Sequence, residues 1–159
     1  MKILIVEDDS NKRKRLVELV CAVVHEATVD ERGSYQSGLA AALAANYDLL
    51  ILDMSMPTYD SMSGTTGNHR RFAGRDIIRE LYRRRRVTRA IVVTQFETFG
   101  EGRNRRTLDE LDRELADNYS AIYDSTVYYH AAQSDWREAL GSKVAEVERR
   151  LRGPMGFTP

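Results

Sequence analysis

Carboxylate side chains follow two strongly apolar segments of the sequence. The run KILIV near the N-terminus is followed by Glu7 and Asp8, and the run LLIL is followed by Asp53. A third apolar run, AIVVT, ends in Thr94. If these runs are strands of one parallel sheet, the three carboxylates and the hydroxyl meet at the edge formed by the carboxyl ends of the strands.

Carboxylates held close together need a positive charge or a proton. Two of them about 4 Å apart repel by roughly 1 kcal/mol in water and about 4 kcal/mol at an effective dielectric constant of 20. Hard oxygen ligands with open positions suit Mg²⁺, which keeps water ligands and accepts phosphate oxygens. An aspartate beside such an ion can attack a phosphoryl donor. The pattern therefore indicates phosphoryl transfer to one of these carboxylates, although strand-end acids that only cap helices are the structural alternative.

The remainder of the chain alternates strand and helix, as a sheet that aligns these acids requires. Apolar runs predict strands at 2–6, 27–30, 48–53, 90–94 and within 126–131, although 121–123 competes for the last position. Helical spacing predicts helices over 10–25, from 34 through 43, over 74–86, from 107 and from 134. This alternation predicts an α/β fold with a doubly wound, five-stranded parallel sheet.

Local signals define the ends and buried faces of these helices. Asp9 or Ser10 can cap the first helix, Thr107 and Glu110 match a capping box, and Ser134 can cap the last helix. Two apolar stripes are expected to face the core. The stripe of the helix over 74–86 consists of Ile77, Ile78, Leu81 and Tyr82. The stripe of the last helix consists of Trp136, Leu140, Val144, Val147 and Leu151.

Composition limits the classes of protein that the chain can represent. Its 159 residues suit one domain, expected over 1–152, with a disordered tail at 153–159. The 24 basic and 24 acidic residues cancel, which argues against nucleic-acid and membrane-surface binding and leaves little electrostatic barrier to a homodimer. The single cysteine, Cys21, excludes an internal disulfide and is expected to be buried. No targeting or membrane segment is visible, so we expect a cytoplasmic protein.

Four segments of the sequence resemble the receiver domain of two-component response regulators, over about residues 2–152. KILIVEDD resembles the first strand and acid pair of that family, and DLLILDMSMP resembles its phosphoacceptor strand. GRDIIREL resembles the start of its third helix, and AIVVT its fourth strand with the switch hydroxyl. The resemblance implies a flavodoxin-like fold with strand order 2-1-3-4-5.

The resemblance also implies roles for individual residues. Asp53 would be the phosphoacceptor, Asp8 would bind Mg²⁺ directly, and Glu7 would bind it through water. The backbone carbonyl of Ser55 would complete the protein ligands of the metal, and Thr94 would hydrogen-bond the phosphoryl group. Such a domain acts in a phosphorelay as a phosphoprotein. It is not an enzyme beyond its own phosphorylation and dephosphorylation.

The sequence departs from the family pattern in its cations and loops. The family carries a lysine after the fifth strand, expected here near Ala131, but the only lysines are Lys2, Lys12, Lys14 and Lys143. His130 could substitute when protonated, although a histidine there is more often simply packed. Gln95 replaces a small residue and could block the phosphoryl pocket. The segments 57–73 and 96–106 are unusually long and therefore candidates for functional or mobile loops.

Three functional hypotheses remain open. The first is a stand-alone, atypical receiver with Asp53 as the phosphoacceptor, and the second is a degenerate receiver that binds partners independently of phosphorylation. The lesser alternative is an aspartate-nucleophile phosphatase, which would require a second aspartate where Ser55 stands. Any output would pass through a protein partner: a histidine kinase, a phosphotransfer protein or an unidentified effector. The partner would dock on the last two helices and strand, or on the 57–73 loop.

Other patterns have simpler interpretations than a functional site. The run Arg83–Arg86 is expected at a helix C-terminus, where the helix dipole favours cations, rather than in a nucleic-acid site. The histidines lack the spacing of a zinc site. Tyr128 and Tyr129 could include the aromatic switch position of the receiver family.

Overall fold

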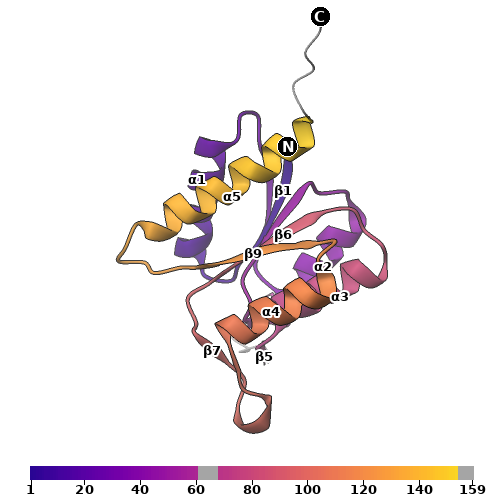
Figure 1. The fold of residues 1–159 in the computed structure, drawn as a ribbon, viewed down its shortest axis with the longest axis vertical. Coiled ribbons are helices and arrows are strands. Elements are labelled where there is room, and N and C mark those ends of the chain that lie inside the picture. Colours follow the sequence, from indigo (N-terminus) through magenta and orange to yellow (C-terminus); the bar gives the residue numbers. More distant parts are fainter. Residues whose placement is uncertain (61–67, 154–159) are drawn as a thin grey trace, which may run out of the picture.

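A five-stranded parallel sheet forms the centre of the protein in the computed structural model, which describes residues 1–60 and 68–153 (Figure 1). The strand order is β2-β1-β3-β6-β9, and each neighbouring pair is parallel. This order confirms the predicted 2-1-3-4-5 arrangement of a flavodoxin-like fold. The strands are β1 (Lys2–Val6), β2 (Thr28–Arg32), β3 (Leu49–Leu52), β6 (Arg89–Thr94) and β9 (Tyr123–Tyr128).

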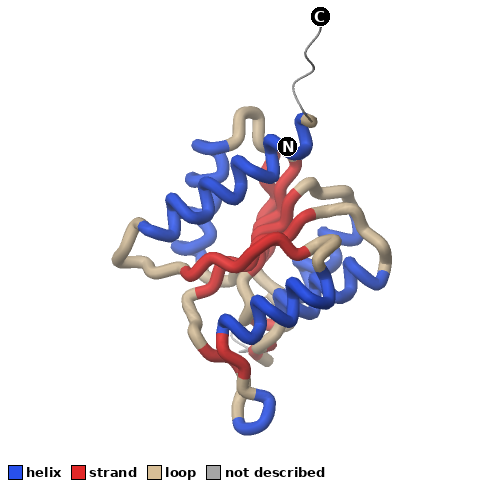
Figure 2. Tube along the Cα trace, in the orientation of Figure 1, coloured by secondary structure: helices blue, strands red, loops and turns tan. Residues whose placement is uncertain are grey.

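Five α-helices cover the two faces of the sheet, as Figure 2 shows. One face packs against α1 (Ser10–Val23) and α5 (Asp135–Arg152). The other packs against α2 (Tyr35–Ala44), α3 (Ala73–Arg83) and α4 (Leu108–Tyr119). Side chains alternate along each strand, so Ile3 and Ile5 face the first layer while Leu4 and Val6 face the second. The central strands are therefore buried on both sides, which explains their continuous apolar sequences.

Helix caps follow the sequence signals with one exception. The Asp9 carboxylate accepts hydrogen bonds from the amides of Asn11 and Lys12, so Asp9 rather than Ser10 caps α1. The capping box of Thr107 and Glu110 is formed, as predicted. The predicted cap of α5 is not, because the Ser134 side chain makes no capping hydrogen bond within the described residues.

Several predicted buried positions were wrong. Tyr82 and Leu151 are exposed: Tyr82 packs edge-on against Tyr119 on the outside of α3 and α4, and Leu151 lies in the last turn of α5. Cys21 is exposed because it directly follows the buried Val20, about 100° further around α1.

The last strand was also misplaced. It spans Tyr123–Tyr128, so it shares residues 126–128 with the predicted range but begins earlier, at the last residue of the competing segment 121–123, where Tyr123 pairs with Ala90 of β6. The β2 strand runs to Arg32, beyond the predicted end at residue 30.

Two short antiparallel hairpins, not predicted from the sequence, occupy the long connections at the carboxyl ends of the strands. In the first, β4 (Met56–Pro57) pairs with β5 (His69–Arg70). In the second, β7 (Thr98–Phe99) pairs with β8 (Arg106–Thr107), with the 3₁₀ turn η1 (Gly102–Asn104) between them. Residues 61–67 of the first connection and 154–159 of the predicted tail lie outside the described residues. The single-domain assignment of 1–152 remains a proposal.

Candidate functional site

The sheet topology brings the predicted acidic residues together. Glu7 directly follows β1 and Asp53 directly follows β3, and the Asp53 amide donates to the Val6 carbonyl at 3.0 Å. Glu7, Asp8 and Asp53 each offer a carboxylate oxygen within 4.8 Å of the other two. Glu7 and Asp53 are buried, whereas Asp8 is exposed. We call these three residues the acid cluster.

A lysine from α1 extends into the acid cluster. The Lys12 ammonium lies 2.6 Å from Glu7 Oε2 and 3.3 Å from Asp53 Oδ2, and it donates a hydrogen bond of 2.8 Å to the Val93 carbonyl. The lysine is only 2% exposed. This arrangement places a fixed positive charge between the two buried carboxylates.

The sequence contains a signal for this lysine that we did not use. Lys12 lies four positions before Leu16 and eight before Val20, so it falls on the same buried stripe of α1 as these two residues. The resemblance to the receiver family places the expected lysine near the fifth strand and not in the first helix.

One lysine does not fully compensate two buried carboxylates. Burial, followed by the charge of Asp53, raises the pKa of Glu7 to about 8, although Lys12 acts to lower it. Burial also raises the pKa of Asp53, against the lowering effects of Lys12 and of the hydrogen bond from the Met54 amide. The buried part of the site therefore favours one more positive charge, supplied by a proton or by a metal ion.

The oxygen atoms of the acid cluster fit a small hard cation. Glu7 Oε1 accepts a hydrogen bond from the Asp9 amide at 3.0 Å. Glu7 Oε2 is buried and makes an ion pair with Lys12, but has no hydrogen bond among the described residues. With the accessible Asp8 carboxylate beside it, the donor set contains only oxygen, which suits Mg²⁺.

The other two predicted site residues lie at the same edge of the sheet. Thr94 ends β6 and is fully buried, and its Oγ1 accepts a hydrogen bond from the Phe96 amide at 3.3 Å. Ser55 is buried two residues after Asp53, and its hydroxyl shares a hydrogen bond of 3.0 Å with His69 Nδ1 of β5. The first hairpin is thus joined directly to the loop that carries Asp53.

A glycine shapes that loop from the start of α3. The Gly74 amide donates to the Met54 carbonyl at 3.1 Å. A Cβ atom at Gly74 would lie 2.5 Å from the Asp53 carbonyl oxygen, a separation that real Cβ atoms do not tolerate. The close approach of α3 to Asp53 therefore requires glycine.

The loop of residues 129–134 that directly follows β9 contains no lysine or arginine. Tyr129 is buried and packs against Trp136, whereas Tyr128 is largely exposed. His130 is exposed rather than packed, and its Nδ1 accepts from the Ala132 amide at 3.3 Å. Gln95 is exposed at the rim of a hollow that Lys12 and Tyr129 also line, so its side chain lies at the edge of the site.

The fold and the acid cluster define the class of the protein, and sequence relatives define its family. No protein-family profile matches the chain. It is 35% identical over 151 residues to the uncharacterized protein y4jR of Sinorhizobium fredii, which covers 94% of this chain and 100% of that protein. It is 30% identical over 150 residues to the Detocs response regulatory protein DtcB of Enterobacter cloacae, covering 92% of this chain and 100% of that protein.

Solved structures show the same fold at low sequence identity. A LuxR-family DNA-binding response regulator from Staphylococcus aureus aligns with a TM-score of 0.64 and 16% identity, covering 93% of this chain and 98% of that one. The response regulator TrrA from Thermotoga maritima, in complex with Mg²⁺ and BeF, aligns with a TM-score of 0.56 and 19% identity, covering 89% and 97%. The chain belongs to the response regulator receiver family, and its fold is that of a receiver domain.

Among the described residues, no helix has the length and apolar character needed to cross a membrane.

Proposed function

We propose that the protein is an atypical receiver in which Asp53 accepts a phosphoryl group in a Mg²⁺-dependent reaction. One observation carries this proposal: the Asp53 carboxylate is buried at the end of β3, within 4.8 Å of two further carboxylates and beside a fixed ammonium group. A purely structural acid at this position would not need two acidic neighbours, because each buried negative charge costs free energy.

The proposed step is a displacement at phosphorus. An Asp53 carboxylate oxygen forms a bond to phosphorus, and the bond from phosphorus to the donor oxygen breaks with its electron pair remaining on the leaving group. With acetyl phosphate as donor, the leaving group is acetate and no proton transfer is required. The buried Thr94 hydroxyl would donate to a phosphoryl oxygen. The Met54 amide and the Lys12 ammonium hold the Asp53 carboxylate in one orientation.

Glu7, Asp8, Asp53 and the carbonyl of Ser55 would hold Mg²⁺. The ion would neutralise charge on the transferred group. The buried Glu7 Oε2, which has an ion pair with Lys12 but no hydrogen bond among the described residues, and the exposed Asp8 support this assignment within the chain. The likeness in fold to TrrA, solved with Mg²⁺ and BeF, supports it from outside the chain.

We further propose that the output of the domain is a protein–protein interaction and that its phosphoryl source is a histidine kinase or phosphotransfer protein. The relationship to a response regulatory protein supports a protein partner. The aspartate-nucleophile phosphatase is not favoured, because the hydroxyl of Ser55 stands where a second carboxylate is needed and is held by His69.

The second candidate is a degenerate receiver that binds partners independently of phosphate. The observation that favours it is the ion pair between Lys12 and Asp53, which already occupies one oxygen of the proposed acceptor. Intact mass spectrometry after incubation with Mg²⁺ and acetyl phosphate separates the two candidates. The phosphoacceptor predicts a gain of one phosphoryl group per chain.

The matched variants are Asp53→Asn, which should lose this gain, and Asp109→Asn in the exposed first turn of α4, which should retain it. A wild-type protein that binds Mg²⁺ by calorimetry but gains no mass would contradict phosphoacceptance and favour the phosphate-independent interaction module.

A further inference from the structure

The Lys12 ammonium lies beside the end of β9, although Lys12 belongs to α1. Its Nζ is 5.4 Å from the centre of the Tyr129 ring, and Tyr129 is the first residue after β9. The family lysine that this chain lacks would follow the same strand. The α1 helix therefore places a buried positive charge in the region where the family lysine after β9 is missing.

Other cations near this edge are engaged elsewhere or face solvent. Arg15 Nη1 donates to the Ala131 carbonyl at 3.1 Å and lies 3.4 Å from the Tyr129 hydroxyl. Arg13 donates to the Glu7 carbonyl, outside the carboxylate pocket, and contacts Glu31. Lys14 is exposed. Among the described residues, Lys12 alone forms an ion pair with Asp53.

The Lys12 ammonium has the hydrogen-bonding capacity to follow a change at Asp53. An ammonium has three N–H groups; that of Lys12 donates to the Val93 carbonyl and forms ion pairs with Glu7 and Asp53. Contacts with Glu7 and Val93 do not depend on the chemical state of Asp53. They can hold the ammonium in place while its third partner changes from a carboxylate oxygen to a phosphoryl oxygen.

We propose that Lys12 is the residue that pairs with the phosphoryl group on Asp53, in place of the lysine that this chain lacks after β9. This inference rests on the proposed phosphoacceptor function. Before phosphorylation, the Lys12 ammonium pairs with the Glu7 and Asp53 carboxylates that would hold Mg²⁺, so it would weaken binding of the ion. During the reaction, the ammonium stabilises the charge that accumulates on the transferred phosphoryl oxygens.

The two roles predict opposite effects of one substitution. Lys12→Met removes the charge and keeps most of the side-chain volume. The affinity of the Lys12→Met variant for Mg²⁺, measured by calorimetry, should be several-fold higher than that of the wild type. Its phosphoryl uptake from acetyl phosphate at saturating Mg²⁺ should be slower by about ten-fold or more. The matched control, Lys14→Met on the exposed side of α1, should follow the wild type in both measurements.

A third measurement tests the charge balance without using the reaction. Mg²⁺ should raise the melting temperature of Lys12→Met more than that of the wild type, because the metal ion then replaces the lost ammonium. If Lys12→Met does not fold without metal, uptake is measured in excess Mg²⁺. Lys12→Gln, which retains a donor for the Val93 carbonyl, then serves as the second uncharged variant.

The possible results separate this inference from the function on which it rests. Wild-type uptake with equally fast uptake by Lys12→Met and Lys12→Gln would overturn the role of Lys12 and leave Asp53 as the acceptor. Slower uptake together with weaker Mg²⁺ binding in the variants would also overturn the role of Lys12, because general damage to the site lowers both the uptake rate and the Mg²⁺ affinity. A wild-type protein that takes up no phosphoryl group would overturn both proposals.

Discussion

Gly74 supports the acid cluster at the scale of a single residue. Its missing side chain allows the first turn of α3 to approach the Asp53 carbonyl so closely that an added Cβ would lie 2.5 Å from the oxygen. The neighbours at this point are backbone atoms of Asp53 and Met54, which cannot turn aside as a flexible side chain can. The geometry of the loop and the identity of residue 74 are therefore linked.

Gly74→Ala should lower the free energy of unfolding by roughly 1–3 kcal/mol, the usual range for overpacking a tight contact, and should weaken Mg²⁺ binding. Chemical denaturation and calorimetry measure the two effects. Gly141→Ala in α5 is the matched control, because its nearest neighbour would be 3.6 Å away and alanine favours a helix. Equal stability of the Gly74→Ala variant and the wild type would show that the loop can relax.

At the scale of elements, the first hairpin is anchored to two helices. Arg70 of β5 pairs with Asp76 of α3 at 2.9 Å, and its guanidinium stacks 3.8 Å from the centre of the Tyr35 ring in α2. Arg79 also pairs with Asp76, at 3.2 Å. The described part of the long connection after Asp53 is therefore held by contacts with both α2 and α3.

Asp76→Asn should release this anchor, because it removes the shared charge and keeps the shape of the side chain. We expect the hairpin amides to exchange about ten-fold faster by hydrogen–deuterium exchange, corresponding to ~1.4 kcal/mol of opening free energy. Glu80→Gln on the same helix is the control, because Glu80 pairs only with the more exposed Arg83 and Arg84. Unchanged exchange at residues 69 and 70 would show that the ion pairs of Asp76 do not contribute to holding β5 in place.

The elements also show which features the sequence could predict. Continuous apolar runs located the three central strands, because buried parallel strands need apolar residues on both faces. Hairpins of two-residue strands leave no periodic pattern and were missed. Helical spacing alone placed Tyr82 in the core, whereas an edge-on contact with Tyr119 keeps it at the surface. The acids were found because they interrupt apolar runs. The burial of Lys12 could be predicted from its place on the apolar stripe of α1, but its partners Asp53 and Val93 could not, because they lie far along the chain.

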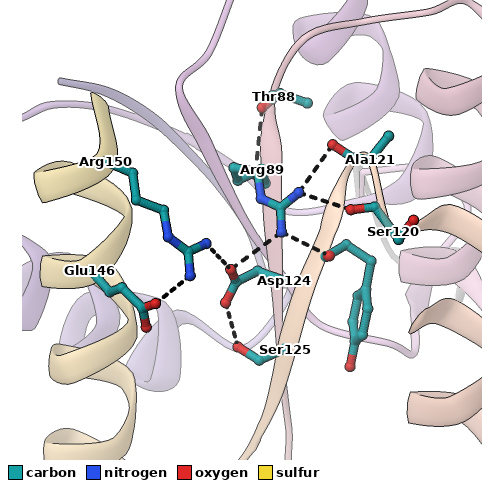
Figure 3. A network of polar contacts seen from close by, with 9 residues as sticks. Thr88, Arg89, Ser120, Ala121, Asp124, Ser125, Glu146 and Arg150 are labelled. Atoms are coloured by element: carbon teal, nitrogen blue, oxygen red, sulfur yellow. Dashed lines mark hydrogen bonds and ion pairs between the residues drawn. The ribbon is translucent and has the colours of Figure 1, made fainter. Parts of the chain in front are cut away.

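At the scale of the whole molecule, Arg89 joins the central sheet to the last third of the chain (Figure 3). Its guanidinium donates to the carbonyls of Ser120, Ala121 and Tyr123 at 2.9–3.1 Å and pairs with Asp124 at 3.4 Å. Arg150 of α5 contacts the same Asp124 carboxylate, also at 3.4 Å. The start of β6, the end of α4, β9 and α5 thus share one polar network.

Arg89→Met should lower the free energy of unfolding by about 1–3 kcal/mol, because it leaves three carbonyl groups without their charged donor and removes one of the two arginines paired with Asp124. Urea denaturation measures this loss. Arg83→Met is the control, since the Arg83 side chain is 70% exposed and forms an ion pair with Glu80 of its own helix; a change within about 0.5 kcal/mol is expected. A comparable effect of both substitutions would mean that the network adds nothing beyond surface charge.

The buried position of Lys12 also constrains the order in which the chain can fold. Its partners Asp53 and Val93 lie 41 and 81 residues further along the chain. Until β6 joins the sheet, the Val93 carbonyl is not available to replace the hydrogen bonds that the Lys12 ammonium makes with water. Burying this ammonium by docking α1 completely therefore costs free energy at that stage. We expect α1 to reach its final position on the face of the sheet late, after the central strands have paired.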